Sequence, residues 1–151
     1  MTSKTKVIVT GASGFLGSHL CRSFNRKSID YIGVSRKNGP MVDVVLNDYK
    51  DLLLTYNKNN ILINLAGNTS NVSVKEYELV SELSDLYKNN MIFFSSSSVY
   101  GTYSPAKISE HALLTNNDEY AKSKISLEEK VMKNNGLVIR LASIYGIRMS
   151  Q

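Results

Sequence analysis

Tyr120 and Lys124 are the residues whose types and spacing most suggest chemistry. They are four residues apart in a segment of helical period, so their side chains would share one helical face. An ammonium near a phenol favours the phenolate and lowers the tyrosine pKa from about 10, at ~1.4 kcal/mol per unit. Such a tyrosine can act as a general acid or base. The alternative is an ordinary exposed helix face, because this spacing recurs by chance.

A second chemical signal is the glycine trio Gly11, Gly14 and Gly17, which directly follows the apolar run Lys6–Val9. Glycine is required where a chain turns tightly and where the backbone approaches a pyrophosphate. A helix that begins just after such a turn offers N–H groups and a partial positive charge to phosphates. A trio between a strand and a helix therefore predicts a dinucleotide site. The alternative is a glycine-rich turn without a ligand.

The end of the second apolar run predicts which dinucleotide binds. Ser35 is followed by Arg36 and Lys37, where an NAD site usually carries an acid for the ribose 2′-hydroxyl. The two cations match a 2′-phosphate instead, so the sequence favours NADP over NAD. The alternative is that Arg36 is a surface charge beside the adenine.

Two further runs end in residues suited to a ligand crevice. The fourth apolar run ends in Asn64–Gly67 (NLAG), where small residues let the chain pass close beneath a cofactor. The fifth is followed by Ser95–Gly101 (SSSSVYG), which places hydroxyl groups at the end of the run. Each signal is weak alone, because a serine run after a strand is also a simple loop.

The elements that would position these residues alternate between short apolar runs and segments of helical period. Near-continuous apolar strands joined by helices predict a parallel sheet covered on both faces, and right-handed crossovers favour a doubly wound sheet. Ligands then bind beyond the carboxyl ends of the strands. The predicted strands are 6–9, 31–34, 41–46, 61–65, 91–94 and 137–141, and the predicted helices are 14–24, 48–56 with Asp48 as cap, 74–88 and 118–133 with Asp118 as cap.

Length and composition fit one α/β domain over residues 1–151 and exclude several classes of function. The net charge of +5 comes from scattered lysines and arginines, which does not suggest a nucleic-acid surface. Cys21 is the only cysteine, so neither an intrachain disulfide nor a cysteine metal cluster is expected, and no His and acid spacing suggests a metal. No signal peptide and no run of ~20 apolar residues is present, so a cytoplasmic protein without membrane contact is expected.

The joint occurrence of these motifs, in this order and at these strand ends, resembles the extended short-chain dehydrogenase/reductases. This is the family of UDP-galactose 4-epimerase and the nucleotide-sugar 4,6-dehydratases, which use NAD or NADP. The resemblance covers Lys6 to Arg148 and includes the final stretch LVIRLASIYGIR. It implies a Rossmann-like NAD(P)-binding domain and a nucleotide-sugar substrate, changed by epimerisation, dehydration or keto-reduction.

The resemblance also implies a role for each motif residue. Ser96 would hydrogen-bond the reacting substrate oxygen, Tyr120 would move the proton there, and Lys124 would hold the nicotinamide ribose and lower the Tyr120 pKa. Ala142 and Ser143 would pack near the nicotinamide. The predicted catalytic residues are thus Ser96, Tyr120 and Lys124, and the predicted cofactor-binding residues are Gly11, Ser13, Gly14, Phe15, Leu16, Gly17, Ser35, Arg36, Leu65, Ala66, Gly67, Tyr120 and Lys124.

The sequence departs from this family in two places. The loop of residues 68–73 lacks an extra segment that relatives carry, and Val74-Lys75 replaces their usual Gly-Thr pair. The chain also stops at Gln151, so it is expected to lack the usual C-terminal substrate domain. A non-catalytic NAD(P)-binding sensor and an inactive truncated remnant therefore remain as alternatives to an enzyme.

The resemblance further makes a homodimer plausible, because helices 74–88 and 118–133 pair in the dimers of many relatives. Two remaining residues are predicted to be structural. His19 is expected on the buried face of the first helix, and Cys21 is expected to be a small buried hydrophobe.

Overall fold

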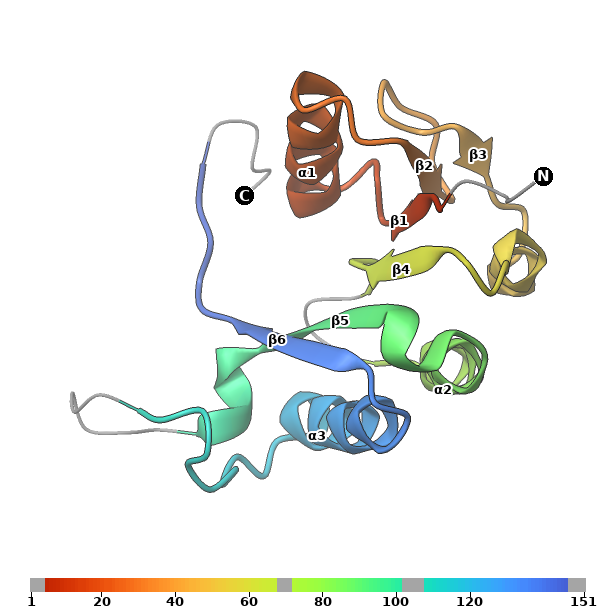
Figure 1. The fold of residues 1–151 in the computed structure, drawn as a ribbon. Helices are drawn as coiled ribbons and strands as arrows, with labels where there is room; N and C mark the ends of the chain where they lie inside the picture. The colour runs from red at the N-terminus through yellow and green to blue at the C-terminus, as the bar shows by residue number, and fades with distance from the viewer. Residues whose placement is uncertain (1–4, 68–71, 102–107, 147–151) are drawn as a thin grey trace.

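The computed structural model describes residues 5–67, 72–101 and 108–146 and shows helices on both sides of one sheet (Figure 1). The helical turns η1–η3 are short 3₁₀ segments. The strands are β1 Val7–Thr10, β2 Tyr31–Ser35, β3 Val44–Val45, β4 Ile61–Asn64, β5 Met91–Ser96 and β6 Leu137–Leu141, and the helical segments are α1 Phe15–Arg26, η1 Tyr49–Thr55, α2 Val74–Tyr87, η2 Lys88–Asn90, η3 Ser97–Tyr100 and α3 Glu119–Lys133.

The six strands form one sheet in the order β3-β2-β1-β4-β5-β6, and every pairing is parallel. The chain runs outward from β1 through β2 to β3, and then crosses to β4 on the other side of β1. The predicted doubly wound sheet is thus confirmed, with its reversal between β1 and β4. Thr10 is paired with Val34 on one side and Asn64 on the other, so these three strand ends lie level at the switch point.

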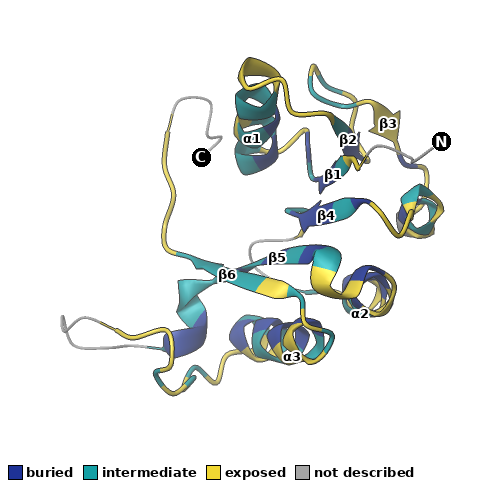
Figure 2. Cartoon of the chain, viewed as in Figure 1, coloured by how far each residue is buried: buried dark blue, intermediate teal, exposed yellow. Residues whose placement is uncertain are grey.

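Alternating side chains of β1 divide the core into two layers, whose dark blue buried residues flank the sheet in Figure 2. Ile8 packs with residues of α2 and α3, including Leu83 and Leu127. Its neighbour Val9 packs on the opposite face with Cys21 of α1, which is fully buried as predicted. Because successive strand residues point to opposite faces, a four-residue strand serves both layers.

The third strand is shorter than predicted, since regular pairing covers Val44–Val45 and not residues 41–46. Asp43 explains the difference. Its carboxylate accepts a hydrogen bond from the Gly33 N–H at 2.7 Å, while its own N–H donates to the Gly33 carbonyl at 2.8 Å. The Asp43 side chain thereby takes the place of a strand carbonyl.

Two predicted caps are confirmed, and one predicted burial is wrong. The Asp118 side chain accepts from the Ala121 N–H at the start of α3. Asp48 forms a capping box with Asp51 at the start of η1, although η1 is a 3₁₀ segment and not the predicted α-helix. His19 is exposed, because it extends from α1 to lie edge-on to Phe15, with ring centroids 4.9 Å apart.

The longest described helix is α3, with 15 residues. Within the part of the chain that the structure describes, no helix combines the length and the apolar character needed to cross a membrane.

Candidate functional site

The glycine loop at the end of β1 is fixed by close backbone contacts. Gly11 has φ +70°, and a Cβ there would lie 3.0 Å from the backbone of Leu65 and Ala66. A Cβ on Gly17 would overlap the Gly11 carbonyl oxygen. The loop therefore requires glycine at both positions, because a side chain would separate β1, β4 and the start of α1.

The loop leads into the N-terminus of α1, which presents unsatisfied backbone donors. Gly14 is the N-cap, makes no side-chain cap bond and donates its N–H to Gly11 O at 2.9 Å. No acidic side chain lies in the first turn, where Phe15 and Leu16 follow. The first N–H groups of a helix have no partner within it and carry partial positive charge, so this end of α1 suits an anion.

Thr10 and Asn64 tie the ends of β1 and β4 together. The Thr10 hydroxyl donates to Asn64 Oδ1 at 2.6 Å and accepts from the N–H groups of Leu65 and Ala66 at 3.2 and 3.1 Å. The Asn64 Nδ2 amide is buried and has no hydrogen-bond partner among the residues that the structure describes. Thr10 is not among the predicted site residues, although its position directly before Gly11 is a usable signal.

The end of β2 is attached to the glycine loop through two serines. The Ser13 and Ser35 hydroxyls are hydrogen-bonded at 2.5 Å, and Ser35 Oγ also accepts from the Lys37 N–H at 3.3 Å. The exposed residues Arg36 and Lys37 follow directly. The contact holds the start of this cationic pair beside the glycine loop.

These strand ends line a groove of about 380 Å³. It is lined by predicted cofactor-binding residues from three strand ends, by Asn64 and by Glu76. Among the predicted residues, Gly11, Ser13, Gly14, Ser35, Arg36, Leu65, Ala66 and Gly67 line the groove, whereas Phe15, Leu16, Gly17, Tyr120 and Lys124 do not. A groove of this size at the topological switch point is where this architecture binds ligands.

Ser96, Tyr120 and Lys124 converge at the carboxyl end of β5. Ser96 is the last residue of β5, and its hydroxyl accepts from the Ser98 N–H at 3.1 Å. Lys124 Nζ lies 5.7 Å from the ring centroid of Tyr120, one helical turn away, and 5.0 Å from that of Phe93 on β5. Lys124 is 5% exposed, so its ammonium is enclosed between α3 and the sheet.

The electrostatics of this trio differ from the sequence prediction. Burial raises the pKa of Tyr120, Glu76 and Asp118 raise it further, and a hydrogen bond with Ser96 opposes the rise. Burial also lowers the pKa of Lys124, against the opposing charges of Glu76 and Glu128. The net shift of the Tyr120 pKa is upward because desolvation and nearby carboxylates dominate, so the effect expected of Lys124 on this pKa stays a prediction.

Glu76 is a site residue that the sequence reasoning missed. It lies in the first turn of α2, is 6% exposed and lines the groove. A signal existed, because Glu76 precedes Val80 by one helical turn and so falls on the face predicted to be buried. A carboxylate on an apolar helix face is unusual enough to mark a site.

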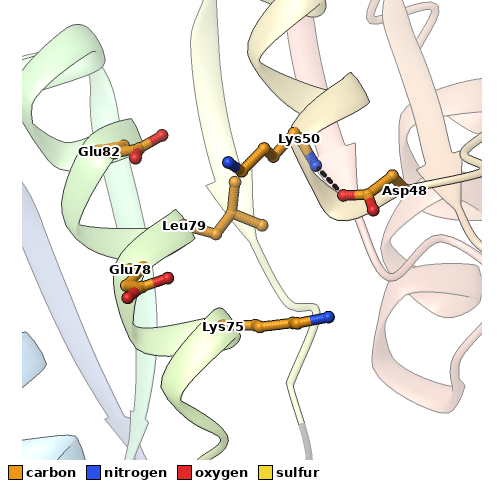
Figure 3. A pocket seen from close by; sticks show the side chains of 6 residues that line it. All are labelled: Asp48, Lys50, Lys75, Glu78, Leu79 and Glu82. Atoms are coloured by element: carbon orange, nitrogen blue, oxygen red, sulfur yellow. Dashed lines mark hydrogen bonds between the residues drawn. The ribbon is translucent and has the colours of Figure 1, made fainter.

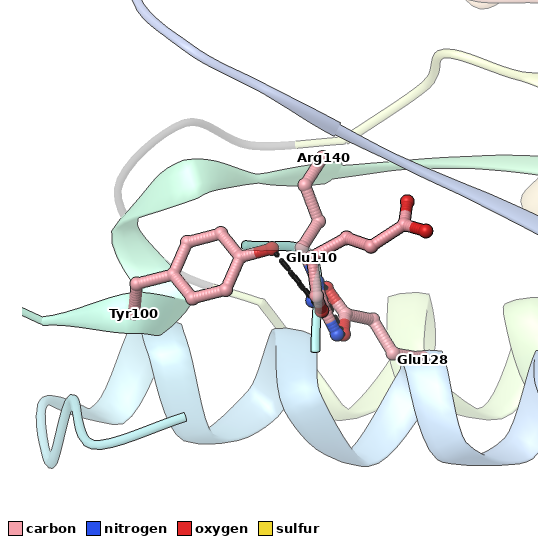
Figure 4. A network of polar contacts seen from close by, with 4 residues as sticks. All are labelled: Tyr100, Glu110, Glu128 and Arg140. Atoms are coloured by element: carbon pink, nitrogen blue, oxygen red, sulfur yellow. Dashed lines mark hydrogen bonds and ion pairs between the residues drawn. The ribbon is translucent and has the colours of Figure 1, made fainter. Parts of the chain in front are cut away.

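A second set of charged contacts ties α3 to β6 (Figure 4). Glu128 is fully buried, and Arg140 grips its carboxylate with N–H···O distances of 2.7 to 3.1 Å. Arg140 Nη1 also donates to the Tyr100 hydroxyl at 2.8 Å and to the Glu110 carbonyl at 2.9 Å. The network fixes the residues that follow the serine run against the helix that carries Tyr120.

A further hollow of about 350 Å³ lies between η1 and α2 (Figure 3). Its walls carry Lys50 and Lys75 together with acids from both elements, and only Leu79 is shared with the groove. Charges of both signs alternate around it, so it has no clear preference for an anion or a cation. Elsewhere too, the described residues contain no cluster of three His, Cys, Asp or Glu side chains that could hold a metal ion.

Comparison with known proteins identifies the family. The sequence profile of the NAD dependent epimerase/dehydratase family matches residues 7–150. No curated protein sequence matches the chain.

Solved structures with the same fold agree with this match. UDP-N-acetylglucosamine 4-epimerase from Bacillus cereus superposes with a TM-score of 0.79 at 23% identity, covering 98% of this chain and 59% of its own. UDP-glucuronic acid 4-epimerase from Bacillus cereus, solved with NAD, gives 0.70 at 22% identity, covering 95% of this chain and 58% of its own. dTDP-glucose 4,6-dehydratase from Bacillus anthracis, also with NAD, gives 0.72 at 18%, covering 95% and 56%. This chain thus spans little more than half the length of these structures.

Proposed function

We propose that this chain, which belongs to the NAD-dependent epimerase/dehydratase family, binds NAD(P) in its groove and acts on a nucleotide sugar through Ser96, Tyr120 and Lys124. The observation that carries the proposal is the groove itself. It begins at the glycine loop and ends at Gly67, where a Cβ would lie 3.7 Å from Lys124 Nζ. The groove therefore runs from a glycine loop suited to a pyrophosphate to a point next to the buried Lys124, whose ammonium lies near the Tyr120 ring.

Two features of the groove fit a dinucleotide. Gly11 and Gly17 exclude side chains where a pyrophosphate would approach the backbone, and the N-terminus of α1 offers donors to it. The buried Asn64 amide, which lacks a partner within the described residues, supplies another donor beside the groove. Ligand oxygen atoms would satisfy such donors.

For the adenosine end of the cofactor, we propose a preference for NADP. Arg36 and Lys37 line the groove just beyond β2, where cations would pair with a 2′-phosphate. Two of the three structures described above were solved with NAD, so the experiment below compares the two cofactors directly.

In the proposed reaction, the bound nicotinamide supplies hydride transfer. The Ser96 hydroxyl would hydrogen-bond the substrate oxygen, and Tyr120 would exchange a proton with that oxygen. Because burial raises the Tyr120 pKa, the phenol keeps its proton at neutral pH and is prepared to donate it to a carbonyl oxygen. This direction matches the keto-reduction that an NADPH site would support.

The substrate class is proposed from the family and from the similar enzymes, whose names specify UDP and dTDP sugars. Epimerisation, dehydration and keto-reduction all begin or end at a sugar oxygen that Ser96 and Tyr120 could hold. A non-catalytic sensor would retain cofactor binding without turnover, and an inactive remnant would show no turnover either.

The first experiment is a fluorescence titration of the 151-residue chain with NADPH and with NADH. Binding of both, with NADPH favoured and the preference lost in Arg36→Ala, is expected. Lys27→Ala, at an exposed lysine beyond the end of α1, is the matched charge control. Binding of neither cofactor would overturn the proposal.

Turnover tests the catalytic assignment. Incubation with UDP and dTDP sugars and cofactor, followed by product analysis, should show conversion that Tyr120→Phe lowers by about 10² to 10⁴-fold while cofactor binding persists. Tyr56→Phe, at an exposed tyrosine outside the residues that line the groove, should leave conversion unchanged. Conversion that survives Tyr120→Phe would contradict the proposed proton transfer.

We also propose a homodimer through the outer faces of α2 and α3. Val74 and Met132, which are 74% and 47% exposed, place apolar surface on these helices. Light scattering of the purified chain would show a mass of two protomers, and a monomer at all concentrations would overturn this assembly.

A further inference from the structure

Glu76 and Lys124 meet beneath Gly67, although they come from different helices. A Cβ placed on Gly67 would lie 2.9 Å from Glu76 Oε1 and 3.7 Å from Lys124 Nζ. Glu76 is 6% exposed and Lys124 is 5% exposed. A carboxylate and an ammonium therefore approach the same point at the end of β4, away from solvent.

The surroundings make Glu76 the principal counter-charge of Lys124. A buried ammonium is costly unless an opposite charge compensates it. Two carboxylates favour the charged form of Lys124, and the effect of Glu76 is larger than that of Glu128. Glu128 is gripped by the Arg140 guanidinium, whose donors lie 2.7 to 3.1 Å from its oxygens. The negative charge of Glu128 is thus largely balanced by Arg140.

Glu76 is itself held by its position on α2. It lies in the first turn, where the partial positive charge of a helix N-terminus stabilises a carboxylate. Its own N–H donates to the cap Ser73 Oγ at 3.2 Å, which fixes the backbone of this turn. The geometry of the cap therefore sets where the carboxylate enters the groove.

We propose that Glu76 is a positioning residue that keeps the Lys124 ammonium charged and directed toward the groove beneath Gly67. The inference rests on the proposed function, in which Lys124 holds the ribose hydroxyls of the cofactor. It deepens that function, because it assigns the charge and orientation of the catalytic lysine to a carboxylate on another helix.

The groups around Lys124 and Tyr120 determine how the site responds to pH. Lys124 faces Glu76 from α2, Tyr120 and Glu128 from α3, and the Phe93 ring from β5. Tyr120 faces Ser96 from β5, Asp118 from the start of α3, and Glu76. Glu76 raises the pKa of both Lys124 and Tyr120, so neutralising it should lower both.

The test is an NMR titration of the full chain labelled with 13Cε lysine, with the Lys124 signal assigned by its loss in Lys124→Arg. Glu76→Gln should lower the Lys124 pKa by about one unit, since opposite charges at this range shift a pKa by roughly one to three units. The matched control is Glu78→Gln, which removes an exposed carboxylate from the same helix and should leave the Lys124 pKa unchanged. Glu76→Asp keeps the charge on a shorter side chain and should give a smaller shift, which provides a second variant if Glu76→Gln unfolds.

Cofactor titrations of the same variants separate this inference from the proposed function. Glu76→Gln should weaken NAD(P)H binding more at pH 9 than at pH 7, by up to about tenfold for a one-unit fall in the Lys124 pKa, because Lys124 then loses its proton at a lower pH. An unchanged Lys124 pKa in Glu76→Gln, or an equal shift in Glu78→Gln, would overturn the role of Glu76. A shifted Lys124 pKa in a chain that binds no cofactor would overturn the proposed function and leave the coupling of Glu76 with Lys124 intact.

Discussion

The glycine-loop region and the charged region of this molecule are built on different physical principles. The first comprises β1, the start of α1 and the end of β2, and it is fixed by backbone contacts that leave no room for a Cβ at Gly11 and Gly17. The second comprises α2, β5, α3 and β6, and buried charges such as Lys124, Glu128 and Arg140 organise it. One region depends on the lack of side chains and the other on long, ionised ones.

This difference determines what a substitution does in each region. In the glycine loop, added atoms have nowhere to go, so the damage is steric. In the charged region, loss of one partner leaves another charge buried without compensation, so the damage is electrostatic. Removing a charged side chain should therefore destabilise the second region, whereas adding side-chain atoms should destabilise the first.

The largest expected effect is in the charged region, at Arg140. Arg140→Met leaves the fully buried Glu128 carboxylate without its guanidinium, and also removes the donor to Tyr100. We expect the free energy of unfolding to fall by about 3–5 kcal/mol, measured by urea denaturation.

Two further variants show whether charge or packing is responsible. Glu128→Leu combined with Arg140→Met should recover most of the lost stability, because an apolar pair leaves no buried charge. Lys122→Met, at a lysine whose side chain is 53% exposed, should change little. A double variant no more stable than Arg140→Met would show that the region is not organised by charge.

The two regions also differ in how far the sequence predicts them. The glycine loop is local, because the seven residues from Gly11 to Gly17 carry the pattern that predicts it, and the structure brings eight of the predicted cofactor-binding residues together in the groove. The charged site joins Glu76, Ser96 and Tyr120 from three separate segments. Spacing located Tyr120 and Lys124 on one face, but the sign of the Tyr120 shift depends on burial and on Glu76, which no local pattern reports.

Side-chain contacts also explain two differences between the predicted and the observed elements. Strand 41–46 was predicted from its apolar residues, yet Asp43 bonds to Gly33 across the sheet and shortens β3. His19 follows helical spacing, but its ring turns outward against Phe15. Asp43 contacts a neighbouring strand, whereas the His19 contact with Phe15 lies within α1, and in both cases a side-chain contact decides the outcome.

The second expected effect is in the glycine loop, at Gly17. Gly17→Ala places a methyl group against the Gly11 carbonyl, so the loop must shift. We expect a loss of about 1–3 kcal/mol in stability, as for overpacked sites, together with loss of NADPH binding. Gly39→Ala is the matched control, because its Cβ would meet nothing closer than 3.7 Å. If both variants bind NADPH like the wild type, the loop is not sterically fixed.

The smallest expected effect is again in the charged region, but at its surface. Asp85 on α2 pairs with Lys130 on α3 at 2.9 Å, and its side chain is 56% exposed. Lys130 and then Asn134 lower the pKa of Asp85 through hydrogen bonds. A carboxylate with a lowered pKa stabilises the fold above the unfolded pKa and loses that contribution as pH falls through the folded pKa. Because solvent screens this pair, Asp85→Asn should cost at most about 0.5 kcal/mol at pH 7, and even less in high salt.

Denaturation at pH 7 and pH 3 should show wild type and variant converging in their free energies of unfolding at the lower pH. A cost at pH 7 equal to that of Arg140→Met would mean that charge alone, and not its burial, organises this region.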